Sequence, residues 1–118
     1  MSSPKIRADE LMKCALALRG VEIEAYRTLL GMGKACVADV AERLGKSRPT
    51  AQRLLQDLVS KGLATRTEDL IGRGGYIYQY EVVPPERVKQ QMVGILNEWH
   101  RKMQRFLEDF PSEIRKRT

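Results

Sequence analysis

A run of basic and amide side chains between residues 46 and 56 has the composition that hydrogen bonding to nucleic acid requires. Arginine donates to guanine edges and to phosphate oxygens, and glutamine pairs with adenine by donating and accepting at once. A helical repeat brings these side chains to one face and the leucines of the same segment to the other. An exposed basic face is costly unless a polyanion meets it, so a nucleic acid is the expected partner. The residues on the polar face are Arg48, Gln52, Arg53 and Gln56.

Positive charge is concentrated around the same segment. Residues 43–75 contain seven lysines and arginines against three acidic residues, which is +4 of the net charge of +6 in under a third of the 118 residues. The isoelectric point of about 9.6 favours anionic partners, which include DNA and acidic membrane surfaces. A merely solvated face is the plainer interpretation, because every surface helix shows polar residues to water. The clustering favours DNA contact.

A membrane is the weaker interpretation of the charge. No run of residues approaches the ~20 apolar positions of a spanning helix, and the N-terminal segment lacks the apolar stretch of a signal peptide. Two cysteines are too few for a disulfide scaffold and fit a reducing cytosol. We therefore expect a cytoplasmic protein with one domain over residues 1–118.

Apolar residues at helical spacing predict the elements that must position the basic face. The helix over residues 37–44 is followed by Gly45, which accepts the positive φ of a tight turn. Ser47 is the expected N-cap of the next helix, and Pro49 lies in its first turn, where no N–H is needed. The predicted helices up to this point are 7–19, stopped by Gly20, then 22–30, 37–44 and 48–61.

The hydrophobic period changes from 3.6 to 2 after Gly62. Residues 63–68 and 76–83 read as strands, and the glycine-rich segment 72–75 reads as the turn between them. Helix, turn, helix and hairpin, in that order, make a winged helix-turn-helix over residues 20–83, whose usual partner is duplex DNA. The fold class is therefore mainly α with a small β-hairpin. The side chains expected to contact DNA are Lys46, Ser47, Arg48, Pro49, Thr50, Gln52, Arg53, Gln56, Arg66 and Arg73.

A long helix over 84–110 is expected at the C-terminus, with Pro111 as its stop and a frayed basic tail over 111–118. Its apolar residues follow steps of 4, 3, 4, 4, 3 and 4, close to a heptad seam. At about 39 Å it is longer than so small a domain can cover, so packing on the parent domain leaves apolar surface for a second chain. We expect a homodimer whose interface includes Leu11, Ala15, Val88, Met92, Ile95, Trp99, Met103, Phe106 and Phe110.

Residues 37–50 and 72–86 resemble the DNA-binding domain of archaeal TrmB-type and MarR-like regulators, and the resemblance covers roughly residues 20–90. It implies that the helix over 48–61 enters the major groove and that the wing over 69–75 reaches toward the minor groove. Lys46 departs from the pattern, because the residue after the turn glycine is usually apolar. Full-length TrmB regulators also carry a C-terminal sugar-binding domain, to which the resemblance does not extend, so sugar sensing is not carried over.

Arg73 lies among three glycines at the wing tip, where the backbone can come close to DNA. The weakly hydrated guanidinium suits a narrow minor groove, whose hydrogen-bonding pattern is degenerate. We expect this contact to hold the protein on DNA without choosing the sequence.

No arrangement of residues indicates an enzyme. His100 is the only histidine, no Cys/His spacing fits a metal site, and residues 72–75 precede a strand rather than the helix of a phosphate loop. No cofactor or metal is expected. Cys36, at the start of the third helix, is a candidate redox-sensitive thiol, although a small buried residue is the commoner role.

Together these features predict a homodimeric, sequence-specific, double-stranded DNA-binding transcription regulator. A non-specific architectural or chromatin protein is one alternative and would bind any duplex with similar affinity. A winged-helix protein–protein module is another and would show no salt-sensitive affinity for DNA. The sequence points to no particular small-molecule effector.

Overall fold

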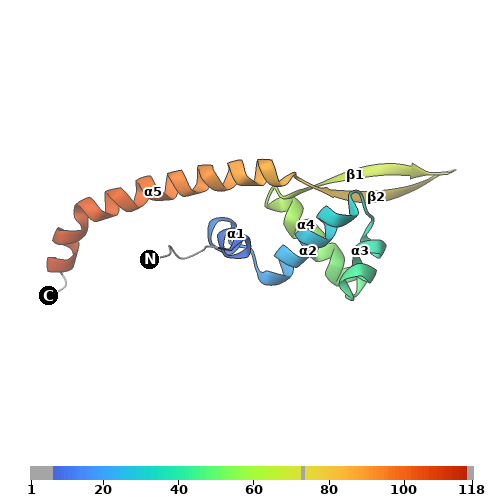
Figure 1. Cartoon of the computed structure of the whole chain (residues 1–118), viewed down its shortest axis with the longest axis horizontal. Helices are drawn as coiled ribbons and strands as arrows, with labels where there is room; N and C mark the ends of the chain where they lie inside the picture. The colour runs from blue at the N-terminus through green and yellow to red at the C-terminus, as the bar shows by residue number, and fades with distance from the viewer. Residues whose placement is uncertain (1–6, 73, 117–118) are drawn as a thin grey trace.

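The computed structural model describes residues 7–72 and 74–116, and the winged helix-turn-helix is confirmed (Figure 1). Helices α2 (Gly20–Met32), α3 (Val37–Leu44) and α4 (Arg48–Ser60) form the body of the domain, the hairpin extends from one side of it, and the last helix extends from the other. The elements are α1 (Ala8–Leu16), α2 (Gly20–Met32), α3 (Val37–Leu44), α4 (Arg48–Ser60), β1 (Ala64–Ile71), β2 (Gly75–Val82) and α5 (Pro85–Lys116).

The turn between α3 and α4 follows the prediction. Gly45 has a φ of 66°, in the left-handed region that glycine adopts without strain, and its N–H donates to the carbonyls at the end of α3. Lys46 continues the turn, and its backbone N–H donates to the carbonyl of Ala41 over 3.0 Å. The departure at Lys46 from the usual apolar residue therefore leaves the turn intact.

The apolar faces of the three central helices meet in one core. Helix α4 packs on both α2 and α3, and the base of the hairpin closes the core from the side. A backbone bridge joins Ala35 to Tyr80, with N···O distances of 3.0 and 2.8 Å, and ties β2 to the loop before α3. The largest fully buried side chains of the core are Tyr80, Ile23, Leu29, Leu55, Leu58, Leu63 and Val40.

Two boundaries near the N-terminus differ from the prediction. Helix α1 ends at Leu16, because Ala17 takes a left-handed conformation with a φ of 54°. The prediction that Gly20 stops this helix was wrong, since Gly20 is the first residue of α2. Gly33, with a φ of 77°, is the residue that caps the end of α2.

The hairpin is longer at its outer end than the prediction. The antiparallel ladder runs from the pair Ala64–Val82 to the pair Ile71–Gly75, so β1 continues three residues past Glu68. Glu68 and Asp69 are polar, but each still pairs with a residue of β2, namely Tyr78 and Ile77, so the ladder continues past the predicted end. The two strands are therefore in register up to the glycine turn.

Helix α5 is also longer than predicted. The prediction that Pro111 ends it was wrong, because the helix contains Pro111 and continues to Lys116. Arg115, which was expected in a frayed tail, is therefore helical. Proline removes one backbone hydrogen bond and bends a helix without necessarily ending it. The ribbon turns aside near its C-terminal end (Figure 1).

The start of α5 is fixed to the core by Tyr26. Its hydroxyl donates to the carbonyl of Val83 over 2.8 Å, just before the two prolines that begin the helix. Burial raises the pKa of the Tyr26 hydroxyl, and the charge of Glu86 raises it further, so the group stays a donor through the physiological range. The strand-to-helix junction is therefore tied to α2.

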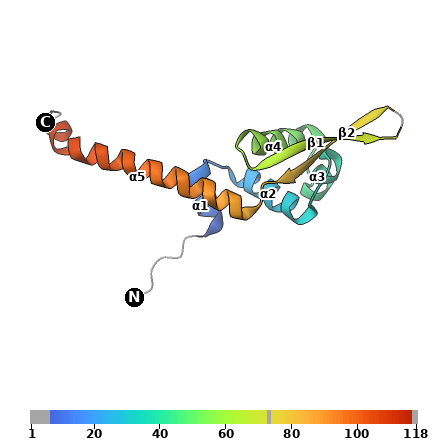
Figure 2. The same ribbon diagram turned by 90° about the horizontal axis from the view of Figure 1, so that it is seen from above.

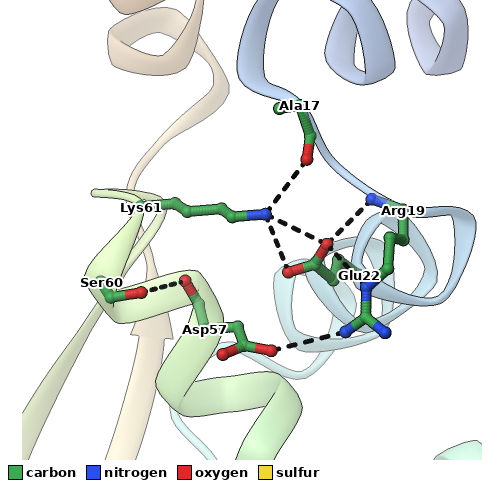
Figure 3. A network of polar contacts seen from close by, with 6 residues as sticks. All are labelled: Ala17, Arg19, Glu22, Asp57, Ser60 and Lys61. Carbon is green, nitrogen blue, oxygen red and sulfur yellow. Dashed lines mark hydrogen bonds and ion pairs between the residues drawn. The ribbon is translucent and has the colours of Figure 1, made fainter.

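A polar network joins the start of α2 to the end of α4 (Figure 3). Glu22 is 1% exposed, and its carboxylate accepts from the backbone N–H of Arg19 at 2.8 Å and from the Lys61 ammonium at 3.1 and 3.2 Å. Lys61 also donates to the carbonyl of Ala17, and Arg19 lies 3.5 Å from Asp57. Burial alone would raise the pKa of Glu22, but these donors outweigh it and lower the pKa below the usual 4.5.

Replacing Glu22 with glutamine should lower the free energy of unfolding at pH 7 by about 1–3 kcal/mol, because an amide cannot accept from Lys61 as a carboxylate does. The folded-state pKa lies below the unfolded value of 4.5, so the stabilisation is complete above that pH and is lost as pH falls through the folded pKa. Urea unfolding of both proteins from pH 7 to pH 3 should give curves that converge in acid.

Glu24→Gln is the matched control, since Glu24 is an exposed glutamate in the same helix. A control that loses as much stability as Glu22→Gln, or a Glu22→Gln deficit that persists at pH 3, would contradict the role of the network.

Candidate nucleic-acid interface

The N-terminus of α4 is capped by a serine and exposed to solvent. Ser47 is the N-cap, as predicted: its Oγ accepts from the backbone N–H of Thr50 at 3.3 Å and donates to Thr50 Oγ1 at 2.9 Å. Pro49 occupies the first turn, where the helix needs no N–H. Arg48, Pro49 and Thr50 are all exposed there, at the positive end of the helix dipole.

Helix α4 divides cleanly into two faces. One face is buried in the core, and the opposite face exposes Arg48, Gln52, Arg53 and Gln56. Within residues 7–72 and 74–116, the side chains of Lys46, Arg48 and Arg53 have neither an ion pair nor a hydrogen bond. These cations remain available to an external anion. The buried face consists of Ala51, Leu54, Leu55 and Leu58.

Packing of α2 against α4 adds a basic residue that the sequence pattern did not identify. Arg19, Lys46 and Arg53 line one small hollow of about 110 Å³, together with the hydroxyl-bearing Thr50. Arg19 is 27 residues away from Lys46 in the sequence, and only the contact between the two helices brings it here. The Arg19 guanidinium is already paired with Glu22 and Asp57, so Lys46 and Arg53 are the cations of this hollow that have no partner among the described residues.

Lys61 was counted with the basic cluster, but the structure uses it inside the protein. Its ammonium binds the buried carboxylate of Glu22, at the opposite end of α4 from Arg48. One of the seven cations in residues 43–75 is therefore neutralised within the chain. The basic surface is smaller than the charge count indicated, and it is centred on the first half of α4.

Arg66 lies beside the second half of α4. It is exposed on β1, and its guanidinium carbon lies 4.5 Å from the centroid of the Tyr78 ring. Stacking on an aromatic ring orients a guanidinium while leaving its edge free to donate. Arg66 and Gln56 line the same hollow of about 370 Å³ between helix and hairpin. The fold thus places these two predicted residues together.

Two predicted features of the wing and of α3 have different outcomes. Arg73 lies outside the described residues, so its expected position at the minor groove stays a prediction. Cys36 is half-buried at the N-cap of α3 and makes no capping hydrogen bond with its side chain.

Among the described residues no three of His, Cys, Asp and Glu gather into a metal-binding group.

The residues expected at a dimer interface separate into two groups. Val88 is 3% exposed and belongs to the core of its own chain, and Met92 packs against that core, so the assignment of Val88 to a partner-facing seam was wrong. Ala15 and Met103 are half-buried, whereas Leu11, Ile95, Trp99, Phe106 and Phe110 are exposed. The sequence pattern missed further exposed apolar residues that widen the stripe beyond a heptad seam, namely Val93, Leu96, Leu107 and Ile114.

None of the helices in residues 7–72 and 74–116 has both the length and the apolar character that crossing a bilayer would need.

Solved structures with the same fold come from archaea and bacteria. A possible transcriptional regulator from Methanosarcina mazei superposes with a TM-score of 0.78 at 20% identity, over 88% of each chain. The archaeal chromatin protein TrmBL2 gives a TM-score of 0.63 at 22% identity, over 91% of this chain and 37% of that one. The homodimeric winged helix-turn-helix DNA-binding domain Mb0332 of Mycobacterium bovis gives 0.51 at 23% identity, over 85% and 93%.

At the level of sequence, the uncharacterized protein MJ1503 of Methanocaldococcus jannaschii is 33% identical over 105 residues, which are 89% of this chain and 80% of that protein. Residues 12–86 match the family described as the sugar-specific transcriptional regulator TrmB. This match spans the helix-turn-helix, the hairpin and the start of α5, and it covers more than half of the sequence. The chain belongs to the TrmB family of transcriptional regulators, with a winged helix-turn-helix DNA-binding fold.

Proposed function

We propose that this protein is a cytoplasmic, sequence-specific regulator that binds double-stranded DNA as a homodimer. Helix α4 enters the major groove, and the wing lies at the adjacent minor groove. The observation that carries the proposal is the exposed face of α4, where Arg48 and Arg53 have no partner among the described residues and Gln52 and Gln56 point the same way.

The dimensions of α4 agree with this arrangement. An α-helix with its side chains is about 10–12 Å wide, and the major groove of B-DNA is about 12 Å wide. Arginine and glutamine are the side chains that read guanine and adenine edges in that groove by paired hydrogen bonds. Lys46, beside the helix, is placed to contact the phosphate backbone and so to fix the position of α4 along the groove.

The shape of the chain supports dimerisation through α5. The radius of gyration is 19.5 Å, against about 13 Å for a compact domain of this size, because α5 extends along a 70 Å axis. Exposed apolar residues continue along it, and Trp99 and Phe106 are 59% and 65% exposed. So large an apolar stripe is favourable when a second copy buries it. The structural neighbour Mb0332 is a homodimer of the same fold.

A non-specific architectural role is the second candidate. The fold is shared with TrmBL2, an archaeal chromatin protein. Gln52 and Gln56 favour the specific regulator, because a neutral amide cannot neutralise phosphate charge, whereas its donor and acceptor together pair with adenine. Selection of bound duplexes from a randomised library separates the two candidates: a regulator enriches one motif, and an architectural protein enriches none.

Replacing Arg48 and Arg53 with alanine should weaken binding to the selected duplex more than binding to a random one. Each lost base contact costs about 1–3 kcal/mol. For the wild-type dimer, neutralisation of ~6 phosphates gives a slope of log K against log salt near −5, and the double variant should show a shallower slope. Fluorescence anisotropy titrations at several salt concentrations measure both effects.

The double variant Arg7→Ala/Arg101→Ala is the control, because it removes two exposed positive charges that lie outside α4 and the hairpin, Arg101 being 3.8 Å from Glu98. Both variants alter exposed side chains and should keep the helical circular dichroism of the wild type. A folded Arg48→Ala/Arg53→Ala protein with unchanged affinity would contradict the assignment of α4.

Introducing a charge at Ile95 or Trp99 should convert dimers to monomers, because each charge would be buried at the interface between the two copies. Sedimentation velocity at micromolar concentration gives the oligomeric state. Affinity for DNA should fall with dimerisation, since two half-sites are then no longer bound together.

Gln104→Glu is the control, because it adds the same charge as Ile95→Glu at an exposed polar position of α5. A wild-type protein that sediments as a monomer would exclude this mode of assembly.

A further inference from the structure

The outer end of the hairpin is apolar and exposed. Leu70 is 70% exposed, Tyr76 63%, Ile71 55% and Tyr78 44%, and we call these four residues the wing end. In the ladder Leu70 pairs directly with Tyr76, and Tyr78 lies on the same face, while Ile71 lies on the opposite face. Both faces of the ribbon are therefore apolar at this end, which is a surface that soluble domains rarely leave uncovered.

Dimerisation through α5 does not cover the wing end. The hairpin and the C-terminal end of α5 lie at opposite ends of the long axis, as both views show (Figures 1 and 2). The wing end is instead continuous with the proposed DNA-binding face. Arg66, stacked on Tyr78, shares a hollow with Gln56 of α4.

Dimensions decide what contact with DNA would require. Side chains on both faces make a β-ribbon about 10 Å thick, since packed sheets are separated by that distance. The minor groove of B-DNA is about 6 Å wide. A hairpin that is apolar on both faces cannot enter it unless the groove opens.

We propose that the wing end is an apolar wedge that opens the minor groove and bends the duplex toward α4. This rests on the proposed function, in which α4 occupies the neighbouring major groove. Apolar side chains inserted at a minor-groove step partly unstack the bases and kink the duplex toward the major groove. The bend therefore brings more of the DNA backbone against the basic residues around α4.

Two carboxylates limit how far the wedge enters. Glu68 is exposed and Asp69 half-exposed on β1, two to three residues behind Ile71. At about 3.4 Å per residue they lie roughly 7–10 Å behind Ile71 along the strand, with Glu68 opposite Tyr78 and Asp69 next to Leu70, and the minor groove is about 7.5 Å deep. The carboxylates therefore reach the phosphates at the rim once Leu70, Ile71 and Tyr76 are inserted, and they oppose the entry of Tyr78.

The wedge also predicts a form of sequence preference without base contacts. Pyrimidine–purine steps such as TA and CA unstack most easily, so the free energy of opening the groove is lowest there. Such a step under each wing is expected in the preferred site, at a position that α4 does not read.

The test uses the 30-bp duplex recovered by selection from a randomised library, labelled at its ends for energy transfer. Wild type should bend it, and Leu70→Thr/Tyr76→Thr should leave it nearly straight, because threonine keeps the strand but is too short and polar to act as a wedge. A single mismatch at the wing step should tighten wild-type binding about ten-fold, since unstacking is then less costly, and should leave the variant unchanged. Thr65→Ser/Thr67→Ser, on the same strand behind the wing end, is the control and should bend DNA like wild type.

A second variant examines the carboxylates. Asp69→Asn should tighten binding more than Glu113→Gln, which removes the same charge from the far part of α5. Equal effects would contradict close approach of the wing to phosphate.

Wild type that binds the selected duplex without bending it, or a threonine variant that bends it equally, would overturn the wedge while leaving the proposed function intact. Failure of wild type to bind any duplex would overturn the proposed function itself. Loss of higher assembly in the DNA-free threonine variant would identify the wing end as a contact between dimers and would also overturn the wedge.

Discussion

Burial of one face of α4 is the constraint on which the rest of the structure depends. Ala51, Leu54, Leu55 and Leu58 occupy the core between α2 and α3, so the helix cannot rotate without exposing them to water. This fixes the direction of the opposite face, with Arg48 and its polar neighbours turned outward. The same burial that stabilises the domain therefore presents the side chains that the proposed function requires.

Polar contacts hold the two ends of α4 in different ways. At its end, Lys61 binds the buried Glu22, which ties the helix to α2 and removes a cation from the surface. At its start, Ser47 satisfies only local backbone and hydroxyl groups. The first turn is consequently ordered, and its polar side chains form no hydrogen bond or ion pair with other elements of the described residues. Charge that serves the fold is thus separated along one helix from charge that remains available to a ligand.

Features that depend on local sequence were predictable, and those that depend on tertiary contact were not. Helical periodicity, Gly45 and Ser47 report conformations set within a few residues, so the helix-turn-helix was correctly predicted. Packing decides whether Val88 faces its own core or a partner. Packing also places Arg19 next to Lys46 and Arg53, far from it in the sequence. Pro111 was wrongly predicted to end α5. A proline removes one backbone hydrogen bond of a helix, but the hydrogen bonds of the surrounding turns decide whether the helix continues. The side chains expected at DNA from α4 are exposed, but no local pattern shows that Lys61 is engaged elsewhere.

The most direct test of the central claim is protection of guanine N7 from methylation by dimethyl sulfate, because N7 lies in the major groove. On the selected duplex, the bound dimer should protect guanines in two clusters about one helical turn apart, one for each α4. Arg48→Ala should remove protection at one position within each cluster. Binding that leaves every guanine N7 reactive would contradict the entry of α4 into the major groove.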